Sequence, residues 1–264
     1  MDELFDLTGR VAVVTGAARG LGQACAAGLA RFGADVALVD LSAELCDAIL
    51  RQVEALGRRG RAYPCDVSDQ QQVAGTTDRI HADFSRIDIL VNNVGITARI
   101  PTVDMPPRKV RELTEVNYLS QYWFCQAAGR IMIDQAAGSI INMSALGGGL
   151  LGMGRGNAAY CATKGAIVAL TRDLACEWGP AGVRVNALAP YWFQTDMNAT
   201  SIFANERFME QVLTKIPIKR IGQPADLVGP LVFLASDAAA LITGLVLPVD
   251  GGTSATCPIE WVAE

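Results

Sequence analysis

The sequence predicts an α/β protein in which helices cover both faces of a doubly wound parallel sheet. Short, mostly continuous apolar runs recur along the chain at 10–16, 35–40, 61–67, 87–95, 138–144, 182–190 and 244–252. Stretches of helical composition with polar positions separate most of these runs. Continuous apolar strands are typical of a sheet buried on both faces, and strands that alternate with helices pair in parallel.

Two of the expected helices have recognisable ends. Residues 18–34 follow the first strand with helical composition and carry a glycine near their end. A second helix is expected over 42–60, with Ser42 as its N-terminal cap and Gly60 closing it. Helical crossovers of this kind are what parallel neighbouring strands require, so both helices favour the same architecture.

Composition narrows the class of protein. The 264 residues are 51% hydrophobic and 19% charged, which indicates a globular chain. Because no linker or repeat divides the sequence, we expect a single domain over 1–264. The hydrophobic period is weak at about 190–217, and we expect this segment to form a flap on the substrate side of the sheet.

Charge and hydropathy give no sign of a nucleic-acid or membrane partner. The formal net charge is -5 at pH 7, and no run of Lys and Arg would reverse it locally. The first residues lack the apolar stretch of a signal peptide, and no apolar run is long enough to span a bilayer. We therefore expect a cytoplasmic protein whose partner is a small-molecule substrate.

Cysteine and histidine content predicts neither a disulfide framework nor a metal site. The 7 cysteines are odd in number, form no C-x-x-C motif and mostly lie in apolar segments. The single histidine, His81, lies in a polar helical stretch and is expected to face solvent. No metal is expected.

A glycine-rich turn links the first strand to the first helix. It reads TGAARGLG over residues 15–22, with glycines at 16, 20 and 22. Glycines let the backbone turn tightly and approach a pyrophosphate, whose charge would face the amide groups and the positive end of the helix dipole. The spacing differs from the commoner G-x-G-x-x-G pattern, and a plain glycine-rich turn is the alternative.

Asp40 ends the second strand, about 20 residues after the glycines. A carboxylate there can bind the hydroxyls of an adenosine ribose, and it would repel a 2′-phosphate by about 4 kcal/mol at about 4 Å. The residue therefore predicts NAD rather than NADP. Arg19 favours the opposite choice, because an arginine in the turn can pair with a 2′-phosphate. A third interpretation is that Asp40 caps the helix at 42–58.

Tyr160 and Lys164 are four positions apart in a stretch of helical composition, so their side chains share one face of the helix. A phenol beside an ammonium group can exchange protons with a substrate. Taken alone, the spacing is equally consistent with an exposed helical pair.

The motifs together resemble the short-chain dehydrogenase/reductase family. They are TGAARGLG, NNVG at 92–95, Asn117, YCATK at 160–164 and LPVDGG at 247–252. The resemblance covers nearly the whole chain, implies a single Rossmann-type domain, and is strongest toward the gluconate 5-dehydrogenase and polyol dehydrogenase branch.

The resemblance also implies roles for the paired residues. Tyr160 would be the acid/base, and Lys164 would lower the pKa of its phenol and hold the nicotinamide ribose. Asn117 would support a water that links Lys164 to solvent. Residues expected to contact the cofactor, from strand ends or from the resemblance, are Gly16, Arg19, Gly20, Leu21, Gly22, Asp40, Leu41, Asp66, Val67, Asn93, Gly95, Tyr160, Lys164, Pro190, Phe193 and Thr195.

The first departure from the family pattern concerns the catalytic serine. Read in register from Asn142, the sequence NMSA puts Ala145 at the serine position and Ser144 one residue before it. The glycine-rich loop that follows is longer than usual and could change the register and turn Ser144 inward. Both readings stay open: either Ser144 is the catalytic hydrogen-bond donor, or the donor is absent at a cost of about 10²–10³ in rate.

The second departure lies at 190–195, where Tyr191 replaces the usual glycine after Pro190. Phe193 and Thr195 keep the spacing expected for contact with the nicotinamide. Tyr191 and Trp192 could stack on an apolar or ring-shaped substrate, which argues against an open-chain sugar acid. Packing inside the flap is the alternative.

The sequence thus predicts an NAD-dependent oxidoreductase. It would transfer a hydride between the nicotinamide and a secondary alcohol or ketone, such as a polyol, a sugar derivative, or a cyclic or aromatic alcohol. The alternatives are a ketoreductase for an acyl or aromatic ketone and a non-catalytic NAD(H)-binding sensor. The resemblance also implies a homotetramer in which helices at 108–135 and 158–178 pair with their copies.

Overall fold

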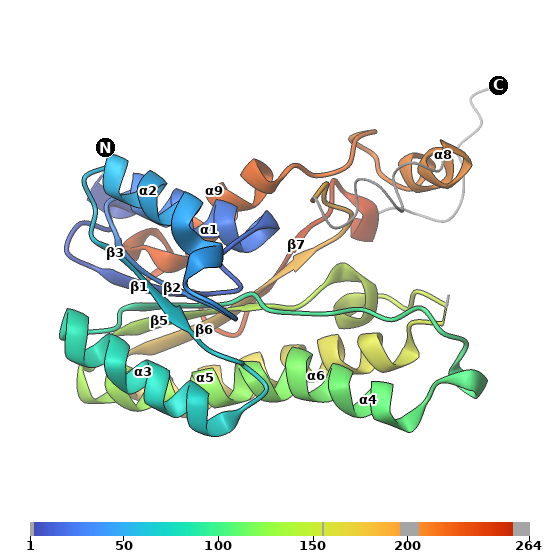
Figure 1. Cartoon of the computed structure of the whole chain (residues 1–264). Helices are drawn as coiled ribbons and strands as arrows, with labels where there is room; N and C mark the ends of the chain where they lie inside the picture. Colours follow the sequence, from blue (N-terminus) through green and yellow to red (C-terminus); the bar gives the residue numbers. More distant parts are fainter. Residues whose placement is uncertain (1–2, 155, 196–205, 256–264) are drawn as a thin grey trace.

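The computed structural model describes residues 3–154, 156–195 and 206–255. Its described strands form one seven-stranded sheet in the order β3-β2-β1-β4-β5-β6-β7, and every pairing is parallel. The predicted doubly wound fold is confirmed (Figure 1). The strands are β1 (Val11–Thr15), β2 (Asp35–Asp40), β3 (Gly60–Pro64), β4 (Ile89–Asn92), β5 (Gly138–Met143), β6 (Val183–Pro190) and β7 (Val246–Val249).

Helices cover both faces of the sheet (Figure 1). One layer contains α1 (Gly20–Arg31), α2 (Asp47–Ala55) and α9 (Val228–Ala235). The other layer contains α3 (Gln70–Phe84), α4 (Pro107–Thr114), α5 (Ser120–Asp134) and α6 (Ala158–Trp178). The short helix α8 (Glu206–Thr214) lies away from both layers, beyond the end of β7. Within the described ranges, no helix is both long and apolar enough to cross a membrane.

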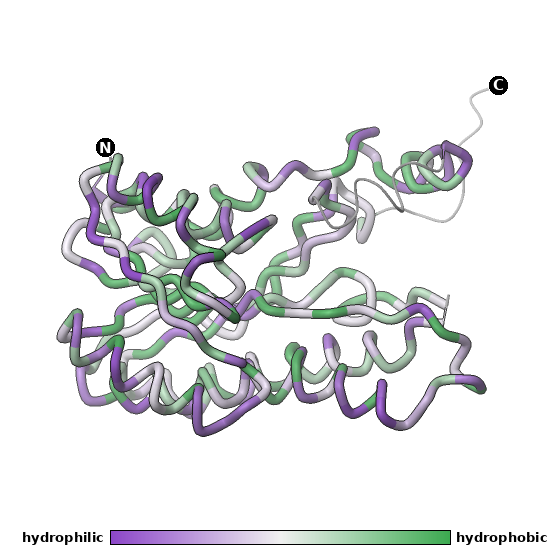
Figure 2. Tube along the Cα trace, in the orientation of Figure 1, coloured by the Kyte–Doolittle hydropathy of each residue, from purple (hydrophilic) through white to green (hydrophobic). Residues whose placement is uncertain are grey.

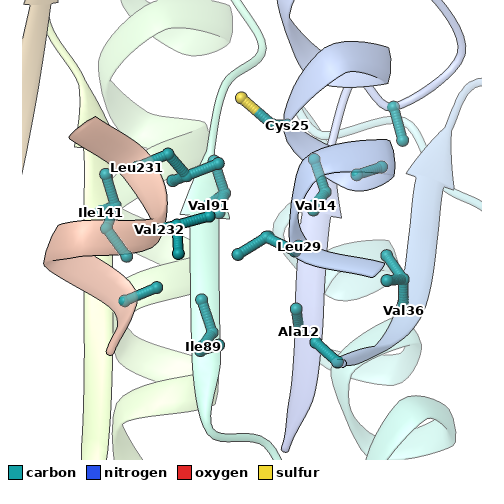
Figure 3. Packing of buried hydrophobic residues seen from close by; sticks show 14 of the residues in the cluster. Ala12, Val14, Cys25, Leu29, Val36, Ile89, Val91, Ile141, Leu231 and Val232 are labelled. Atoms are coloured by element: carbon teal, nitrogen blue, oxygen red, sulfur yellow. The ribbon is translucent and has the colours of Figure 1, made fainter. Parts of the chain in front are cut away.

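Each face of the sheet has its own hydrophobic core. On the α1 and α9 side, strand residues interdigitate with helix residues, and all of those labelled in Figure 3 are buried. They are Ala12, Val14, Cys25, Leu29, Val36, Ile89, Val91, Ile141, Leu231 and Val232. Figure 2 shows hydrophobic residues along the central strands and a mixture of hydrophobic and hydrophilic residues along the outer helices. This distribution explains why the strand sequences are continuously apolar.

Two predicted helices differ from the structure. The segment expected at 42–60 begins as a short 3-10 turn and becomes α2 only at Asp47, and the Ser42 side chain does not cap it. The chain leaves the helix early because Gly57 takes a left-handed conformation with φ +72. The segment at 108–135 is divided by a π-helical turn at Glu115–Leu119.

The segment expected as a flap at 190–217 is described in part. It begins at the end of β6 and ends after α8, and its middle part, 196–205, lies outside the described residues. Its role as a cover for the substrate stays a prediction.

The order of the strands reverses direction at β1. Its two neighbours are β2 and β4, so the chain leaves β1 on one side and returns on the other. Crossovers that leave in opposite directions open a crevice at the carboxyl ends of the strands, which is where ligands bind in this architecture. The glycine-rich turn after β1 and the loop after β4 both lie at this place.

Candidate active site

The glycine-rich turn has the backbone form that a dinucleotide requires. Gly16 and Gly20 have φ of +64 and +59, which side chains rarely adopt. A Cβ at Gly22 would collide with the Gly16 carbonyl oxygen and the Asn93 side chain. The turn is therefore a close-packed cradle that requires glycine at positions 16, 20 and 22, and it leads into the N-terminus of α1, where a pyrophosphate is favoured.

Asn93 connects this turn to the end of β4. Its Nδ2 donates hydrogen bonds to the carbonyl oxygens of Thr15 at 3.0 Å and Gly16 at 3.2 Å. Its main-chain N–H donates to Thr15 Oγ1 at 2.9 Å. Because three hydrogen bonds fix the two strand ends, the cradle is preformed. The role of Thr15 was missed in the sequence, where its hydroxyl carries no distinguishing signal.

The remaining residues of the turn lie around its opening. Arg19 is the N-terminal flanking residue of α1, is exposed, and makes no capping bond. Leu21 is half-buried in the first turn of the helix. A Cβ at Gly20 would lie 3.5 Å from Thr195 Cγ2, so the segment after β6 reaches the turn from the opposite side. The structure thus brings Thr195 and the glycines together.

Asp40 lies against the same turn. Its carboxylate accepts hydrogen bonds from the N–H of Ala18 at 3.0 Å and from its own neighbour Leu41 at 2.9 Å. The interpretation of Asp40 as a cap for the following helix is therefore wrong. Leu41 is exposed beside it. These two hydrogen bonds hold the Asp40 carboxylate beside the glycine-rich turn. Its negative charge is therefore fixed where an adenosine ribose would lie.

Asp66 and Val67 follow β3 on the same edge of the sheet. The Asp66 carboxylate accepts from the Ser68 main chain at 3.0 Å and hydroxyl at 2.7 Å. The Asp66 residue is exposed and the Val67 side chain is buried. Both stay predictions as adenine contacts.

Tyr160 and Lys164 lie one turn apart on α6, as their spacing predicts. Lys164 is only 3% exposed, and its Nζ donates to the carbonyl oxygen of Met143, at the end of β5, at 2.7 Å. The same Nζ lies 5.9 Å from the centre of the Tyr160 ring. The ammonium group is therefore near the phenol but hydrogen-bonded to the main chain of the sheet.

Burial shifts both groups away from their charged forms. It lowers the pKa of Lys164 to about 8. Burial, with Cys161 as a second cause, raises the pKa of Tyr160 to about 12. Here the desolvation of the phenolate is not offset by an ammonium group in contact with it. The lowered phenol pKa that the resemblance implies also draws on the positive charge of bound oxidised nicotinamide, so it stays a prediction for the cofactor-bound protein.

Asn117 lies in the π-helical turn between α4 and α5 and is fully buried. Its side chain accepts from the Ile96 N–H at 2.7 Å and donates to the Ile96 carbonyl at 2.9 Å and to Thr163 Oγ1 at 3.2 Å. A Cβ at Gly95 would lie 3.4 Å from Lys164 Nζ and 3.5 Å from Asn117 Oδ1. The loop after β4, the π-helical turn and α6 therefore meet at Lys164.

Ser144 does not point toward the phenol. It is buried, and its hydroxyl donates to the carbonyl oxygen of Lys164 at 3.0 Å, within the main chain of α6. Its main-chain N–H pairs with Leu188 on β6, so the strand keeps its register. The long loop has not turned Ser144 inward, and this geometry favours the reading that leaves Ala145 at the serine position.

The segment after β6 combines aromatic and charged groups. The Trp192 ring contacts Tyr191, with centroids 5.8 Å apart, and the Phe208 ring of α8 at 5.4 Å. The Arg99 guanidinium lies over the Trp192 ring at 5.4 Å. Sequence analysis missed Arg99, although a basic residue shortly after a strand end that binds cofactor is a usable signal.

Phe193 and Pro190 are turned toward the protein. Phe193 is buried, and a Cβ at Gly222 would lie within 3.0 Å of its ring. Pro190 pairs with Val249 on β7. Behind them is a hollow of about 140 Å³, lined among others by Tyr191, Trp192, Arg220 and Asp226. Tyr160 and Lys164 are not among the residues that line it.

Histidine and cysteine take no part in the site. His81 is exposed on α3, as predicted. Over the residues that the structure describes, no group of acidic, cysteine or histidine side chains could hold a metal ion, and the six described cysteines are free.

Comparison with known proteins places the chain in a family. A family model described as enoyl-(acyl carrier protein) reductase matches residues 16–254, from the glycine-rich turn to the end of the last strand and beyond. The chain belongs to the short-chain dehydrogenase/reductase family. The resemblance seen in the sequence is confirmed, and the chain is an oxidoreductase of the alcohol dehydrogenase and ketone reductase kind.

Several relatives cover nearly all of this short-chain dehydrogenase/reductase. Gluconate 5-dehydrogenase of Gluconobacter oxydans is 39% identical over 250 residues, which are 95% of this chain and 96% of that protein. D-threitol dehydrogenase of Mycolicibacterium smegmatis is 38% identical and covers 94% of each chain. The crystal structure of a gluconate 5-dehydrogenase from Burkholderia cenocepacia, in complex with NADP and tartrate, has a TM-score of 0.92, 34% identity, and covers 97% of this chain and 99% of that one.

Proposed function

We propose that the protein is a dehydrogenase that prefers NAD and oxidises one secondary alcohol of a sugar acid or polyol to a ketone. The observation that carries this proposal is the meeting of Tyr160, Lys164 and Asn117 near the turn whose glycines at 16, 20 and 22 form the cradle. Retention of all three groups argues against a protein that only binds NAD(H). The names of the relatives supply the substrate class.

The residues divide the work of the reaction. When bound, the nicotinamide supplies the hydride acceptor. The cradle at Gly16, Gly20 and Gly22 would bind the pyrophosphate, and Asp40 the ribose. Tyr160 would take the proton of the substrate hydroxyl. Because burial raises the pKa of the phenol, the phenolate needs positive charge brought close to it, which Lys164 can supply if it leaves the Met143 carbonyl.

Asn117 would support the movement of the proton away from the site. Its side chain binds the main chain of Ile96 and the hydroxyl of Thr163, the residue before Lys164. A water beside these groups would connect the ammonium group to solvent. The hydrogen bonds of Asn117 are observed, and its role in a proton path is part of the proposal.

Arg99 favours an acidic substrate. Its guanidinium is exposed and lies over Trp192, close to the segment expected to cover the substrate. An arginine on an aromatic face is positioned to bind a carboxylate. The Burkholderia relative was crystallised in complex with tartrate, which is itself a hydroxy acid. A cyclic or aromatic alcohol remains the alternative, and a ketoreductase is the same site working in reverse.

The preference for NAD rests on Asp40. Its carboxylate is fixed by Ala18 and Leu41 at the mouth of the turn, whereas Arg19 is exposed and makes no capping bond that would hold its side chain there. A 2′-phosphate would meet a fixed negative charge before it met the arginine. Two related gluconate 5-dehydrogenase structures contain NADP, so the preference for NAD would set this chain apart from them.

We also propose a homotetramer in the cytoplasm, as the family resemblance implies. The outer faces of α5 and α6 would be the contacts between copies. Partly buried aromatic residues on α5, among them Tyr122 and Trp123, give these faces the apolar area that an interface needs.

One experiment tests the activity and the cofactor together. NADH and NADPH formation would be followed for the purified protein with sugar acids, polyols, cyclic alcohols and aryl secondary alcohols. We expect turnover of a sugar acid or polyol with NAD, and about 10²-fold or more weaker kcat/KM with NADP. Asp40→Ala should remove this difference between the two cofactors. Asp47→Asn is the control, because it removes one negative charge at the exposed start of α2, away from the turn. Turnover only with NADP would contradict the Asp40 argument, and cofactor binding without turnover would support a sensor.

A further inference from the structure

Among the described residues, the end of β5 offers the candidate site no free side-chain hydrogen-bond donor. The developing charge on a substrate oxygen needs donors besides the acid/base, and each is worth about 10²–10³ in rate. Position 145 holds alanine, and the hydroxyl of Ser144 is bound to the main chain of α6. A reacting oxygen at Tyr160 would therefore have no second side-chain donor from the end of β5.

Asn157 lies on the same face of α6 as the catalytic pair. It directly precedes the helix, and its carbonyl accepts the N–H of Cys161 at 2.8 Å, so its backbone already follows the helical path. Tyr160 is three positions further and Lys164 is seven. Residues spaced by three and seven share a helix face, so Asn157, Tyr160 and Lys164 form one stripe that ends near the carboxyl edge of the sheet.

Most of the Asn157 residue is buried, and its side-chain amide is not used in the packing of the helix. The residue is 7% exposed. An asparagine at this position normally caps the helix with its own side chain, but here it makes no such bond, and its φ of -107 and ψ of 13 lie outside the extended region that capping requires. No other described group hydrogen-bonds its amide. Among the described residues, the buried side-chain atom without a partner is Gln121 Oε1, so the Asn157 amide is not sealed from solvent and a ligand can reach it.

The surroundings of Asn157 are built by two loops that border the site. Ile100 of the loop after β4 donates its N–H to the Gly156 carbonyl at 3.1 Å, one residue before Asn157. On the other side, Gly148 of the long glycine-rich loop packs on Cys161, so that a Cβ there would collide with it. The amide therefore lies between the loop that carries Arg99 and the loop that follows Ala145.

We propose that Asn157 is a catalytic residue whose side-chain amide donates a hydrogen bond to the reacting oxygen of the substrate. It takes the place of the hydroxyl that position 145 lacks, and this role rests on the dehydrogenase function proposed above. In oxidation the substrate O–H bond breaks and its proton goes to the Tyr160 phenolate. The hydride leaves the carbinol carbon for the nicotinamide and the C=O bond forms, while Asn157 keeps its protons. Because an amide does not titrate, it adds no ionisation to the pH profile.

The test removes the amide at position 157 and, in a second step, introduces a hydroxyl at position 145. Asn157→Leu and Asn157→Asp keep the size but lack the N–H donor, and Asp retains capping ability. Both should lower kcat about 10- to 100-fold at unchanged NADH affinity, measured by fluorescence titration, and unchanged melting temperature within a few degrees. Loss in the Leu variant alone would indicate a structural role and overturn the proposal.

Ala145→Ser supplies the decisive comparison. In the Asn157→Leu background it should recover at least about tenfold in kcat, and in the wild-type background it should change kcat less than about threefold. Equal factors in both backgrounds would show that the two positions act independently and would overturn the proposal. Full kcat in Asn157→Leu would overturn this role alone, whereas wild-type protein without turnover of any alcohol would overturn the dehydrogenase function on which it rests.

Discussion

Lys164 is held at both ends by the carboxyl end of β5. Its Nζ donates a hydrogen bond to the carbonyl oxygen of Met143. Its main-chain carbonyl oxygen accepts a hydrogen bond from the hydroxyl of Ser144, the residue that follows Met143 in the chain. The serine that the sequence offered as a catalytic donor thus fixes the helix that carries the lysine. In this structure the Ser144 side chain holds α6 against the end of β5.

Replacing Ser144 by alanine should separate these roles. The variant loses one buried hydrogen bond, so its free energy of unfolding should fall by about 1 kcal/mol, and kcat should fall less than about tenfold. Ser139→Ala is the matched control, because Ser139 lies on the same strand and donates to the Leu234 carbonyl at 2.9 Å, on the opposite side from α6. A loss of about 10²–10³ in kcat for Ser144→Ala alone would instead make Ser144 the direct donor.

The buried ammonium group should make stability depend on pH. The pKa of Lys164 is lowered to about 8 in the folded protein, whereas an unfolded lysine titrates at about 10.4. Between these values the unfolded chain binds more protons, so the free energy of unfolding should rise with pH. Lys164→Met removes this rise, and the difference between wild type and variant should change by about 3 kcal/mol from about pH 7 to about pH 10.5.

Urea unfolding at several pH values measures this difference. The exposed Lys215 provides the control, and Lys215→Met should follow the wild-type curve. Parallel curves for wild type and Lys164→Met would mean that the ammonium group is not desolvated as the structure indicates.

At the scale of elements, the turn between β1 and α1 is the most constrained connection of the site. Two glycines adopt left-handed angles, and a third packs against the first one's carbonyl and Asn93. The shape of the turn is therefore set by close packing rather than by flexibility. Any side chain at position 22 must displace the backbone that would bind the pyrophosphate.

Gly22→Ala should consequently weaken NADH binding by about tenfold or more and lower the free energy of unfolding by about 1–3 kcal/mol. Gly75→Ala is the control, because Gly75 lies within α3 with no atom within 4 Å of an added Cβ. That change should raise stability by about 0.5–1 kcal/mol. Fluorescence titration and urea unfolding measure both effects, and normal NADH affinity in the Gly22→Ala variant would contradict the close-packed cradle.

The elements themselves were largely predictable, because hydrophobic period and glycine position are local signals. The parallel strands, the turn at 15–22 and the stripe of Tyr160 and Lys164 all follow from such signals. The direction of the Ser144 hydroxyl did not, since it depends on how a distant helix packs on β5. The raised pKa of Tyr160 and the contact of Arg99 with Trp192 likewise arise only when separate segments meet.

At the scale of the whole molecule, the cofactor crevice lies between the two halves of the sheet. The turn belongs to one half, and Lys164 and Thr195 belong to the other. A ligand that contacts both halves should stabilise the folded chain as a unit. Saturation with NADH at about 100 times its Kd should add about 2.7 kcal/mol and raise the melting temperature by roughly 5–10 °C.

Scanning calorimetry or dye-based melting measures this shift. NADPH at the same concentration should raise the melting temperature of the wild-type protein much less, and the two cofactors should act more equally on Asp40→Ala. A shift with NADPH as large as that with NADH would contradict the charge argument at whole-molecule level.

The order of the strands also bears on how the chain is made. A ribosome releases residues from the N-terminus, and folding can begin before synthesis ends. In the order β3-β2-β1-β4-β5-β6-β7, each new strand pairs with one that has already emerged. The sheet can therefore grow outward from β1 during translation. Until Ile89–Asn92 has left the ribosome, however, one edge of β1 has no neighbour, and the nascent chain at that length presents an open apolar edge to other chains.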